Sequence, residues 1–279
     1  MPRKMLLALG IAILVLANAV QAWAWPLFPE RSPAKADVVV IMYHLVTKNP
    51  KYQGKFGISP EELEADFIYL KENGYNTILM EDLINFADRK RPLPKKPVLL
   101  TFDDGRFSDH LYVLPLLEKY KTKAVFSVIG TETDENSDKS GNKKPHMGWE
   151  QVAELAASKY TEVQNHSYNL HGDNGSAKLR SESLEKYQAR FGADTSKQQE
   201  LTLKNTGSTP TTYTYPLGII SKGSQEVLEG LGMRSSLSCV EGINHIVQGE
   251  PLFMLRRNNR EHGKPVGEIL RKLESKQHG

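Results

Sequence analysis

The sequence lacks most of the features that would mark a specialised class of protein. Cys239 is the single cysteine among 279 residues, which excludes an intrachain disulfide. Lys and Arg number 36 against 33 Asp and Glu, and this near balance gives no electrostatic footprint for nucleic acid. No internal repeat is present, and the apolar and charged fractions, 39% and 25%, are ordinary. Wholesale disorder, a fibrous repeat and a polytopic membrane protein are therefore excluded, and no nucleic-acid partner is expected.

The N-terminus has the pattern of a secretory signal. A positively charged start precedes the apolar run Met5–Ala17, and small residues follow. This pattern predicts a signal peptide over residues 1–24, cleaved after Ala22 or Ala24. The alternative is an uncleaved anchor, but even when extended to Val20 the segment has 16 residues, fewer than the ~20 of a comfortable span. We expect a secreted or cell-envelope protein, outside the cytoplasmic membrane, that contacts the membrane only if the leader is uncleaved.

The rest of the chain is expected to form a tether, residues 25–37, and one domain, residues 38–279. The tether carries three prolines and mixed charge. Beyond it, short apolar runs alternate with helical patterns. The predicted strands are Val38–Met42, Pro97–Phe102, Ala124–Ile129, Thr161–Asn165 and Tyr213–Tyr215, and the predicted helices are Pro60–Asn73, His110–Tyr120 and Trp149–Ala157. This alternation predicts an α/β fold with a parallel sheet covered by helices, and at this length we favour a (β/α) barrel with fewer than eight strands over an open sheet.

Chemically versatile residues stand directly after several predicted strands. Asp103 and Asp104 follow the second strand, His166 and His171 follow the fourth, and His44 follows the first. Because the carboxyl ends of parallel strands open on one face of a barrel, these side chains should converge. Asp104 with two imidazoles would give three metal ligands and an open position, as in hydrolytic zinc sites. Taken singly, an Asp-Asp-Gly segment is more often a turn, and a lone histidine is more often a solvated residue.

At these residues the chain resembles the polysaccharide deacetylases of carbohydrate esterase family four, the NodB-homology domain. Thr101–Gly105, TFDDG, is similar to that family's first motif, and Ala124–Gly130 to the strand that follows it. Met147–Glu150 resembles the segment that opens the next helix. Asn165–His171 is similar to the second motif, and Tyr215–Gly218, YPLG, to the third. The motifs appear in the family's order over most of residues 98–220.

The resemblance implies a fold and a set of roles. The fold would be a distorted barrel of the NodB-homology type. Asp104, His166 and His171 would bind a divalent metal, with zinc the expected ion, and Asp103 would act as the general base on the attacking water. The backbone N–H of Leu217 would help to hold the oxyanion. Tyr215 and Pro216, in the third motif, are expected to contact the substrate.

The chain departs from the common family pattern in three respects. Its second-motif histidines are five residues apart instead of four, a form that resembles the branch containing the poly-N-acetylglucosamine deacetylases. Thr214 stands where the third motif usually has an arginine that braces the catalytic Asp, and Arg256, Arg257 or Arg260 could substitute. The usual C-terminal Leu-x-His is missing, but Tyr43–His44 resembles a Tyr-His pair that supplies the acid in the same branch, so His44 is the predicted general acid.

The sequence therefore predicts an exported, metal-dependent N-deacetylase acting on an acetylated polysaccharide, either peptidoglycan or poly-N-acetylglucosamine. The products would be acetate and a free amine. The alternative is a glycan-binding protein that keeps the fold but turns over poorly, which the missing arginine at Thr214 favours. A facial triad that holds Fe(II) for oxygen chemistry ranks below both, because the second aspartate would have no role there.

Overall fold

The computed structural model describes residues 34–139, 141 and 144–277. The predicted signal peptide, residues 1–24, and residues 25–33 of the predicted tether lie outside this range. The described residues from Lys35 onward belong to one unit. Among the residues that are described, no helix is long and apolar enough to cross a membrane.

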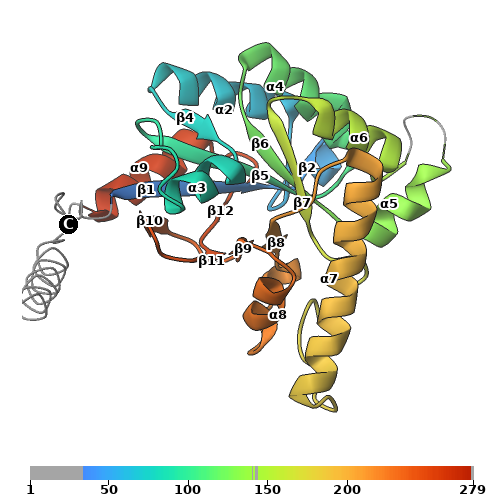
Figure 1. The fold of residues 1–279 in the computed structure, drawn as a ribbon. Coiled ribbons are helices and arrows are strands. Elements are labelled where there is room, and N and C mark those ends of the chain that lie inside the picture. The colour runs from blue at the N-terminus through green and yellow to red at the C-terminus, as the bar shows by residue number, and fades with distance from the viewer. Residues whose placement is uncertain (1–33, 140, 142–143, 278–279) are drawn as a thin grey trace, which may run out of the picture. The chain divides into compact units, whose positions relative to one another are not determined.

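Strands and helices alternate along most of the described chain (Figure 1). The strands are β1 (Lys35–Tyr43), β2 (Leu45–Val46), β3 (Gly57–Ile58), β4 (Asn76–Ile78), β5 (Pro97–Asp104), β6 (Ala124–Val128), β7 (Thr161–Asn165), β8 (Thr212–Thr214), β9 (Ser235–Leu237), β10 (Ile243–Val247), β11 (Leu252–Leu255) and β12 (Asn258–Asn259). The helices are α2 (Pro60–Glu72), α3 (Met80–Ala87), α4 (Leu114–Tyr120), α5 (Gly130–Ser137), α6 (Trp149–Ala157), α7 (Leu184–Thr206), α8 (Ser224–Gly230) and α9 (Val266–Gln277). A π-helical turn, Asp109–Val113, leads into α4.

The main sheet is a nearly closed barrel. Its strand order is β10-β1-β5-β6-β7-β8-β9-β11, and every neighbouring pair from β1 to β11 is parallel, whereas β10 is antiparallel to β1. The short strand β12 follows β11 closely and pairs in parallel with β1, so residues 252–259 connect β9 back to β1. The predicted distorted (β/α) barrel is confirmed, with a parallel ring made of β1, β5, β6, β7, β8, β9 and the β11–β12 segment.

Two asparagine side chains complete the seam between β10 and the β11–β12 segment. Asn244 accepts a hydrogen bond from the backbone N–H of Arg256 at Oδ1 (2.8 Å) and donates from Nδ2 to the carbonyl of the same residue (2.9 Å). Asn258 accepts from the backbone N–H of Gly242 at Oδ1 (3.1 Å) and donates from Nδ2 to the carbonyl of Gly242 (2.9 Å). Each amide thus satisfies an N–H and a C=O where no regular ladder forms.

Strands β5 and β6 and most of β1 are buried on both faces, which explains their largely apolar sequences. On β5, Val98, Leu100 and Phe102 pack in a cluster that includes residues of α2, α4 and α6, while Leu99 belongs to a second cluster with residues of α3. Figure 1 shows α2, α4 and α6 along one side of the sheet, and the long helix α7 extending well beyond it.

Most predicted elements are present, with local differences. Helix α2 begins as expected, because the side chain of Ser59 accepts from the N–H of Glu62 and Glu62 accepts from the N–H of Ser59. Strand β1 begins at Lys35, so the last residues of the predicted tether are part of the sheet. The strongly polar stretch from Glu132 to Lys144 begins as a helix, since α5 occupies its first half and buries Thr133 and Asn136.

Candidate active site

The carboxyl ends of the parallel strands open into a cavity of about 660 Å³. Seven of the residues that the sequence predicts to be functional line it: His44, Asp103, Asp104, His166, His171, Tyr215 and Leu217. They come from the ends of β1 and β5, the loop after β7 and the segment after β8. Pro216 is buried and is not among the lining residues. The barrel therefore brings together groups that are far apart in the sequence.

Asp104, His166 and His171 form a compact set of metal-ligating groups. Their ligand atoms all lie within 4.8 Å of one another. Asp104 Oδ1 is 3.3 Å from His171 Nε2 and 3.6 Å from His166 Nε2. Nδ1 of His166 lies 2.8 Å from the carbonyl oxygen of Thr214. Because a carbonyl can only accept, Nδ1 carries the proton and leaves the lone pair of Nε2 facing Asp104.

The second oxygen of Asp104 is held by a cation. Arg106 donates to Oδ2 from Nη2 at 2.7 Å and from Nε at 3.2 Å, so Oδ1 is the oxygen that faces the histidines. Burial opposes ionisation of Asp104, but its interactions with the His166 and His171 rings outweigh it and hold the pKa of this carboxyl well below its usual value. Arg106 was not among the residues predicted from the sequence, although it stands only two positions after Asp104.

A tight turn allows two histidines five residues apart to face one point. Ser167 has a φ of 71°, an uncommon conformation for a residue with a side chain. Its N–H donates to Asn165 Oδ1 (2.8 Å), and its Oγ accepts from the N–H of Leu170 (3.1 Å). Strained backbone is typical of functional sites, and here the turn reverses the chain between His166 and His171.

The same loop is anchored by a carboxylate from α7. Asp194 accepts the backbone N–H of Tyr168 at Oδ1 and that of Asn169 at Oδ2, both at 2.8 Å. These two bonds fix consecutive peptide groups between the histidines. Sequence analysis did not identify Asp194, because a single Asp inside an otherwise polar helix carries no signal of its own.

Asp103 is paired with Arg257 in the interior of the barrel. Arg257 Nη1 donates to Asp103 Oδ1 at 2.7 Å, and Arg257 Nε donates to the carbonyl of Ser238 at 2.8 Å. Both side chains are buried. Burial alone would raise the pKa of Asp103, but the positive charge of Arg257 outweighs it, so the pKa of Asp103 is lowered. Asp103 is thereby kept ionised and oriented.

The other two arginines that could have replaced the missing third-motif Arg are engaged elsewhere. Arg260 pairs with Asp66, with its Nε 2.7 Å from Oδ2. Arg256 is exposed and donates to the carbonyl of Glu241 at 2.9 Å. Of the three candidates, Arg257 is the one that contacts Asp103.

His44 faces the second oxygen of Asp103. Its Nε2 lies 3.9 Å from Asp103 Oδ2, and its ring is tilted against that of Phe56, with 4.8 Å between the centroids. Burial lowers the pKa of His44, and the charge of Asp103 opposes this shift only in part. Asp103 thus has one oxygen on a buried cation and the other directed toward an imidazole.

The segment after β8 exposes a backbone turn at the cavity. Leu217 has a φ of 57°, and its side chain is 54% exposed. Gly218 follows with a φ of 68°, and an added Cβ there would lie 2.7 Å from Cβ of Cys239, so glycine is required. Tyr215 is buried at the wall of the cavity, and its hydroxyl is engaged with Ser224 Oγ at 2.8 Å.

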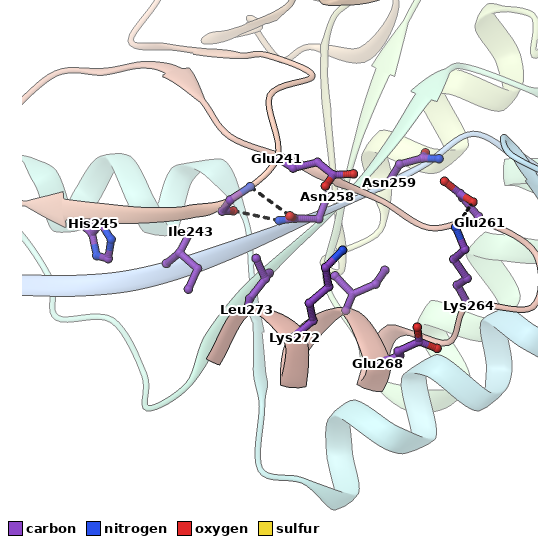
Figure 2. Close-up of a pocket in the computed structure, with 12 residues that line it drawn as sticks. Glu241, Ile243, His245, Asn258, Asn259, Glu261, Lys264, Glu268, Lys272 and Leu273 are labelled. Carbon is purple, nitrogen blue, oxygen red and sulfur yellow. Dashed lines mark hydrogen bonds and ion pairs between the residues drawn. The ribbon is translucent and has the colours of Figure 1, made fainter. Parts of the chain in front are cut away.

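A second cavity of about 300 Å³ adjoins the first (Figure 2). The two share Glu241, Asn259 and Glu261 in their walls. Figure 2 shows the ion pair between Lys264 and Glu261 on one side and residues of α9 along the other. The second cavity therefore shares a wall with the cavity that Asp103 and His44 line, and residues of α9 form its other side.

The model of one protein family, polysaccharide deacetylase, matches residues 90–236, more than half of the chain. The chain belongs to the polysaccharide deacetylase family. The match spans Asp103, Asp104, His166, His171 and Leu217, which places these cavity residues within the family's domain. It ends before Arg257, whose contact with Asp103 is known from the structure alone.

Relatives of this chain carry a more specific name. The chain is 26% identical over 234 residues to poly-beta-1,6-N-acetyl-D-glucosamine N-deacetylase of Escherichia coli K12, covering 75% of this chain and 35% of that protein. It is 23% identical over 190 residues to the Staphylococcus aureus N315 protein of the same name, covering 67% and 62%. The chain thus spans about a third of the length of the first and less than two thirds of the second.

Solved structures support the same fold. IcaB from Ammonifex degensii superimposes with a TM-score of 0.67 at 26% identity, covering 79% of this chain and 90% of that one. A de-N-acetylase from Aggregatibacter actinomycetemcomitans superimposes with a TM-score of 0.73 at 24% identity, covering 85% and 99%. The distorted barrel is therefore that of NodB-type deacetylases.

Proposed function

We propose that the chain is an exported, metal-dependent N-deacetylase that hydrolyses N-acetyl groups on a glycan containing N-acetylglucosamine. One observation carries the proposal. Asp103, fixed by Arg257 and 3.9 Å from His44, lines the same open cavity as the Asp104, His166 and His171 set. Export rests on the leader pattern of residues 1–24.

The three ligating residues fit a divalent metal, and their chemistry fits zinc. Two neutral imidazole nitrogens and one carboxylate oxygen are a donor set that zinc accepts in hydrolytic sites, with a position left open. The proton of His166 is on Nδ1, which keeps Nε2 available. When bound, such a cation would lower the pKa of water and polarise a carbonyl oxygen.

The remaining roles belong to the protein's own groups. Asp103 would accept a proton from the attacking water at Oδ2, because Oδ1 is occupied by Arg257. His44, 3.9 Å from that oxygen, would donate a proton from Nε2 to the departing amine. The backbone N–H of Leu217 would stabilise the negative charge that develops on the acetyl oxygen. Acetate and a free amine would leave the site.

The relatives favour one glycan over another. Proteins that resemble this chain over most of its length are named for poly-beta-1,6-N-acetyl-D-glucosamine. The five-residue spacing of His166 and His171 and the position of His44 resemble that branch as well. We therefore propose poly-N-acetylglucosamine as the substrate in preference to peptidoglycan.

Acetate release tests the proposal. The chelator-treated protein, alone and with zinc restored, is offered β-1,6-linked N-acetylglucosamine pentamer and, separately, peptidoglycan. Zinc-dependent acetate from the pentamer, at a rate well above that from peptidoglycan, is expected. Binding of the pentamer without acetate release, by folded and zinc-loaded protein, would support the glycan-binding alternative instead.

A further inference from the structure

The loop between β2 and β3 presents two aromatic side chains to the catalytic cavity. Tyr52 is 65% exposed and Phe56 is 49% exposed, and both line the cavity that contains Asp103 and His44. Phe56 contacts the ring of His44 and so borders the reacting group. Tyr52 lies four residues earlier in the same loop and belongs to no ring pair among the described residues. Its exposed ring is therefore not explained by internal packing.

Backbone hydrogen bonds hold this loop in place. The N–H of Leu45 donates to the carbonyl of Phe56 (2.9 Å), and the N–H of Gly54 donates to the carbonyl of Gly57 (2.8 Å). The loop is also tied to the segment after β12, because the N–H of His262 donates to the carbonyl of Gly54 (2.9 Å). Its position is thus set by the barrel and not by local sequence alone.

Gly57 shows how closely the loop is folded. A Cβ at this position would lie 2.0 Å from the carbonyl oxygen of Tyr52, a distance that no side chain can occupy. The absence of a side chain at Gly57 therefore lets the backbone of Tyr52 pass directly over it. This close contact holds the backbone of Tyr52 against Gly57, so the Tyr52 side chain starts from a fixed position beside the cavity.

An exposed, preorganised tyrosine beside a catalytic cavity is suited to binding a ring with an apolar face. Large exposed apolar surfaces on folded proteins usually mark binding sites, and tyrosine offers a broad surface at a low cost in side-chain entropy. A pyranose ring carries C–H groups on its faces, which pack against the electron-rich face of an aromatic ring.

We propose that Tyr52 forms a binding subsite for a second sugar unit of the glycan, stacking on its pyranose ring while the neighbouring unit is at Asp103. The inference rests on the proposed function and adds a determinant of chain-length preference to it. Tyr52 lines the same cavity of about 660 Å³ as Asp103 and His44, so one glycan chain can contact all three residues.

The test compares substrates with and without sugar units. For wild type and Tyr52→Ala, kcat/KM is measured on the β-1,6-linked pentamer and on 4-nitrophenyl acetate, and the value for the pentamer is divided by the value for 4-nitrophenyl acetate. Loss of one ring contact is expected to lower this ratio about two- to tenfold. Tyr52→Phe, which keeps the ring, should retain the wild-type ratio. Leu203→Ala is the matched control, since Leu203 is 46% exposed on α7 and does not line the cavity.

Measuring the affinity for the pentamer distinguishes a failure of this inference from a failure of the proposed function. In the Asp103→Asn background, pentamer affinity is measured by calorimetry with and without Tyr52→Ala. A two- to tenfold weaker affinity supports the subsite even if the wild type releases no acetate, an outcome that would refute only the deacetylase proposal. An unchanged affinity together with an unchanged substrate ratio would overturn the subsite.

Discussion

Replacing Arg257 by methionine should destabilise the protein strongly and change how its stability depends on pH. Arg257 is fully buried, and it donates at 2.7 Å to Asp103 and at 2.8 Å to the carbonyl of Ser238. Methionine retains much of the side-chain length but no charge and no donor. Removing one partner of a buried ion pair costs about 3–5 kcal/mol, because the other charge remains buried without compensation. We expect a loss of about 4 kcal/mol in the free energy of unfolding at neutral pH.

The pH dependence follows from the pKa of Asp103. In the wild type this pKa is lowered, so the group adds stability above its unfolded pKa, and this stability is lost as the pH falls through the folded pKa. Without Arg257, burial dominates and raises the pKa of Asp103. The variant then loses stability as the pH rises from the unfolded pKa toward the raised one. The difference in the free energy of unfolding between variant and wild type should therefore be largest near pH 7 and should shrink as the pH falls toward and below the unfolded pKa.

The assay is urea unfolding of metal-free protein at several pH values in a double-mutant cycle. The set comprises wild type, Arg257→Met, Asp103→Asn and the double variant. The double variant should be more stable than the sum of the single effects predicts, by about 1–3 kcal/mol, since neither charge is left alone. A loss below about 1 kcal/mol for Arg257→Met, additive with Asp103→Asn and independent of pH, would refute the pairing.

Three further predictions concern the loop, the metal ligands and a buried carboxyl. Asp194→Asn replaces one of the two oxygens that accept from the loop by a hydrogen-bond donor. In a chelator competition this variant should bind zinc about 10–100-fold more weakly. Glu200→Gln, an exposed change on the same helix, should leave the affinity for zinc unchanged. Zinc should raise the melting temperature of the wild type, and His171→Ala should abolish that rise; an equal rise in both would count against the ligand set. Burial raises the pKa of Glu162 to about 7, so the wild type loses stability as the pH rises from 4.5 to 7. Over this range the free energy of unfolding of Glu162→Gln should rise by about 3 kcal/mol relative to that of the wild type. A difference in the free energy of unfolding that does not change with pH would contradict the raised pKa.

Strands β1, β5, β6, β7 and β8, helix α2 and the predicted metal ligands followed from local patterns, whereas the strands after β8 and the long helix α7 were not predicted. Continuous apolar runs fit strands buried on both faces, and the Ser59 and Glu62 pair fits a capping box. The convergence of Asp104 with the histidines followed from a general property of parallel barrels. These features depend on short-range spacing and on one rule of topology, so they can be predicted from a single sequence.

Other features depend on long-range geometry that no local pattern encodes. Arg256 and Arg257 are neighbours, and the irregular register between β9 and β11, with Met254 at a φ of 59°, decides which of them faces Asp103. Asp194 acts on a loop that follows a different strand, and only the packing of α7 brings it there. The seam between β10 and the β11–β12 segment is likewise made by the side chains of Asn244 and Asn258, which replace backbone pairing.

The measurement that tests the central claim most directly is the release of acetate and of free amine from the β-1,6-linked pentamer by zinc-loaded wild type, Asp103→Asn and His44→Ala. The wild type should release both products in equal amounts. Each variant, still folded and still binding zinc, should be slower by about 10²–10⁴-fold, the contribution typical of a general base or acid. A wild-type rate in Asp103→Asn, or no release by folded, zinc-loaded wild type, would contradict the account.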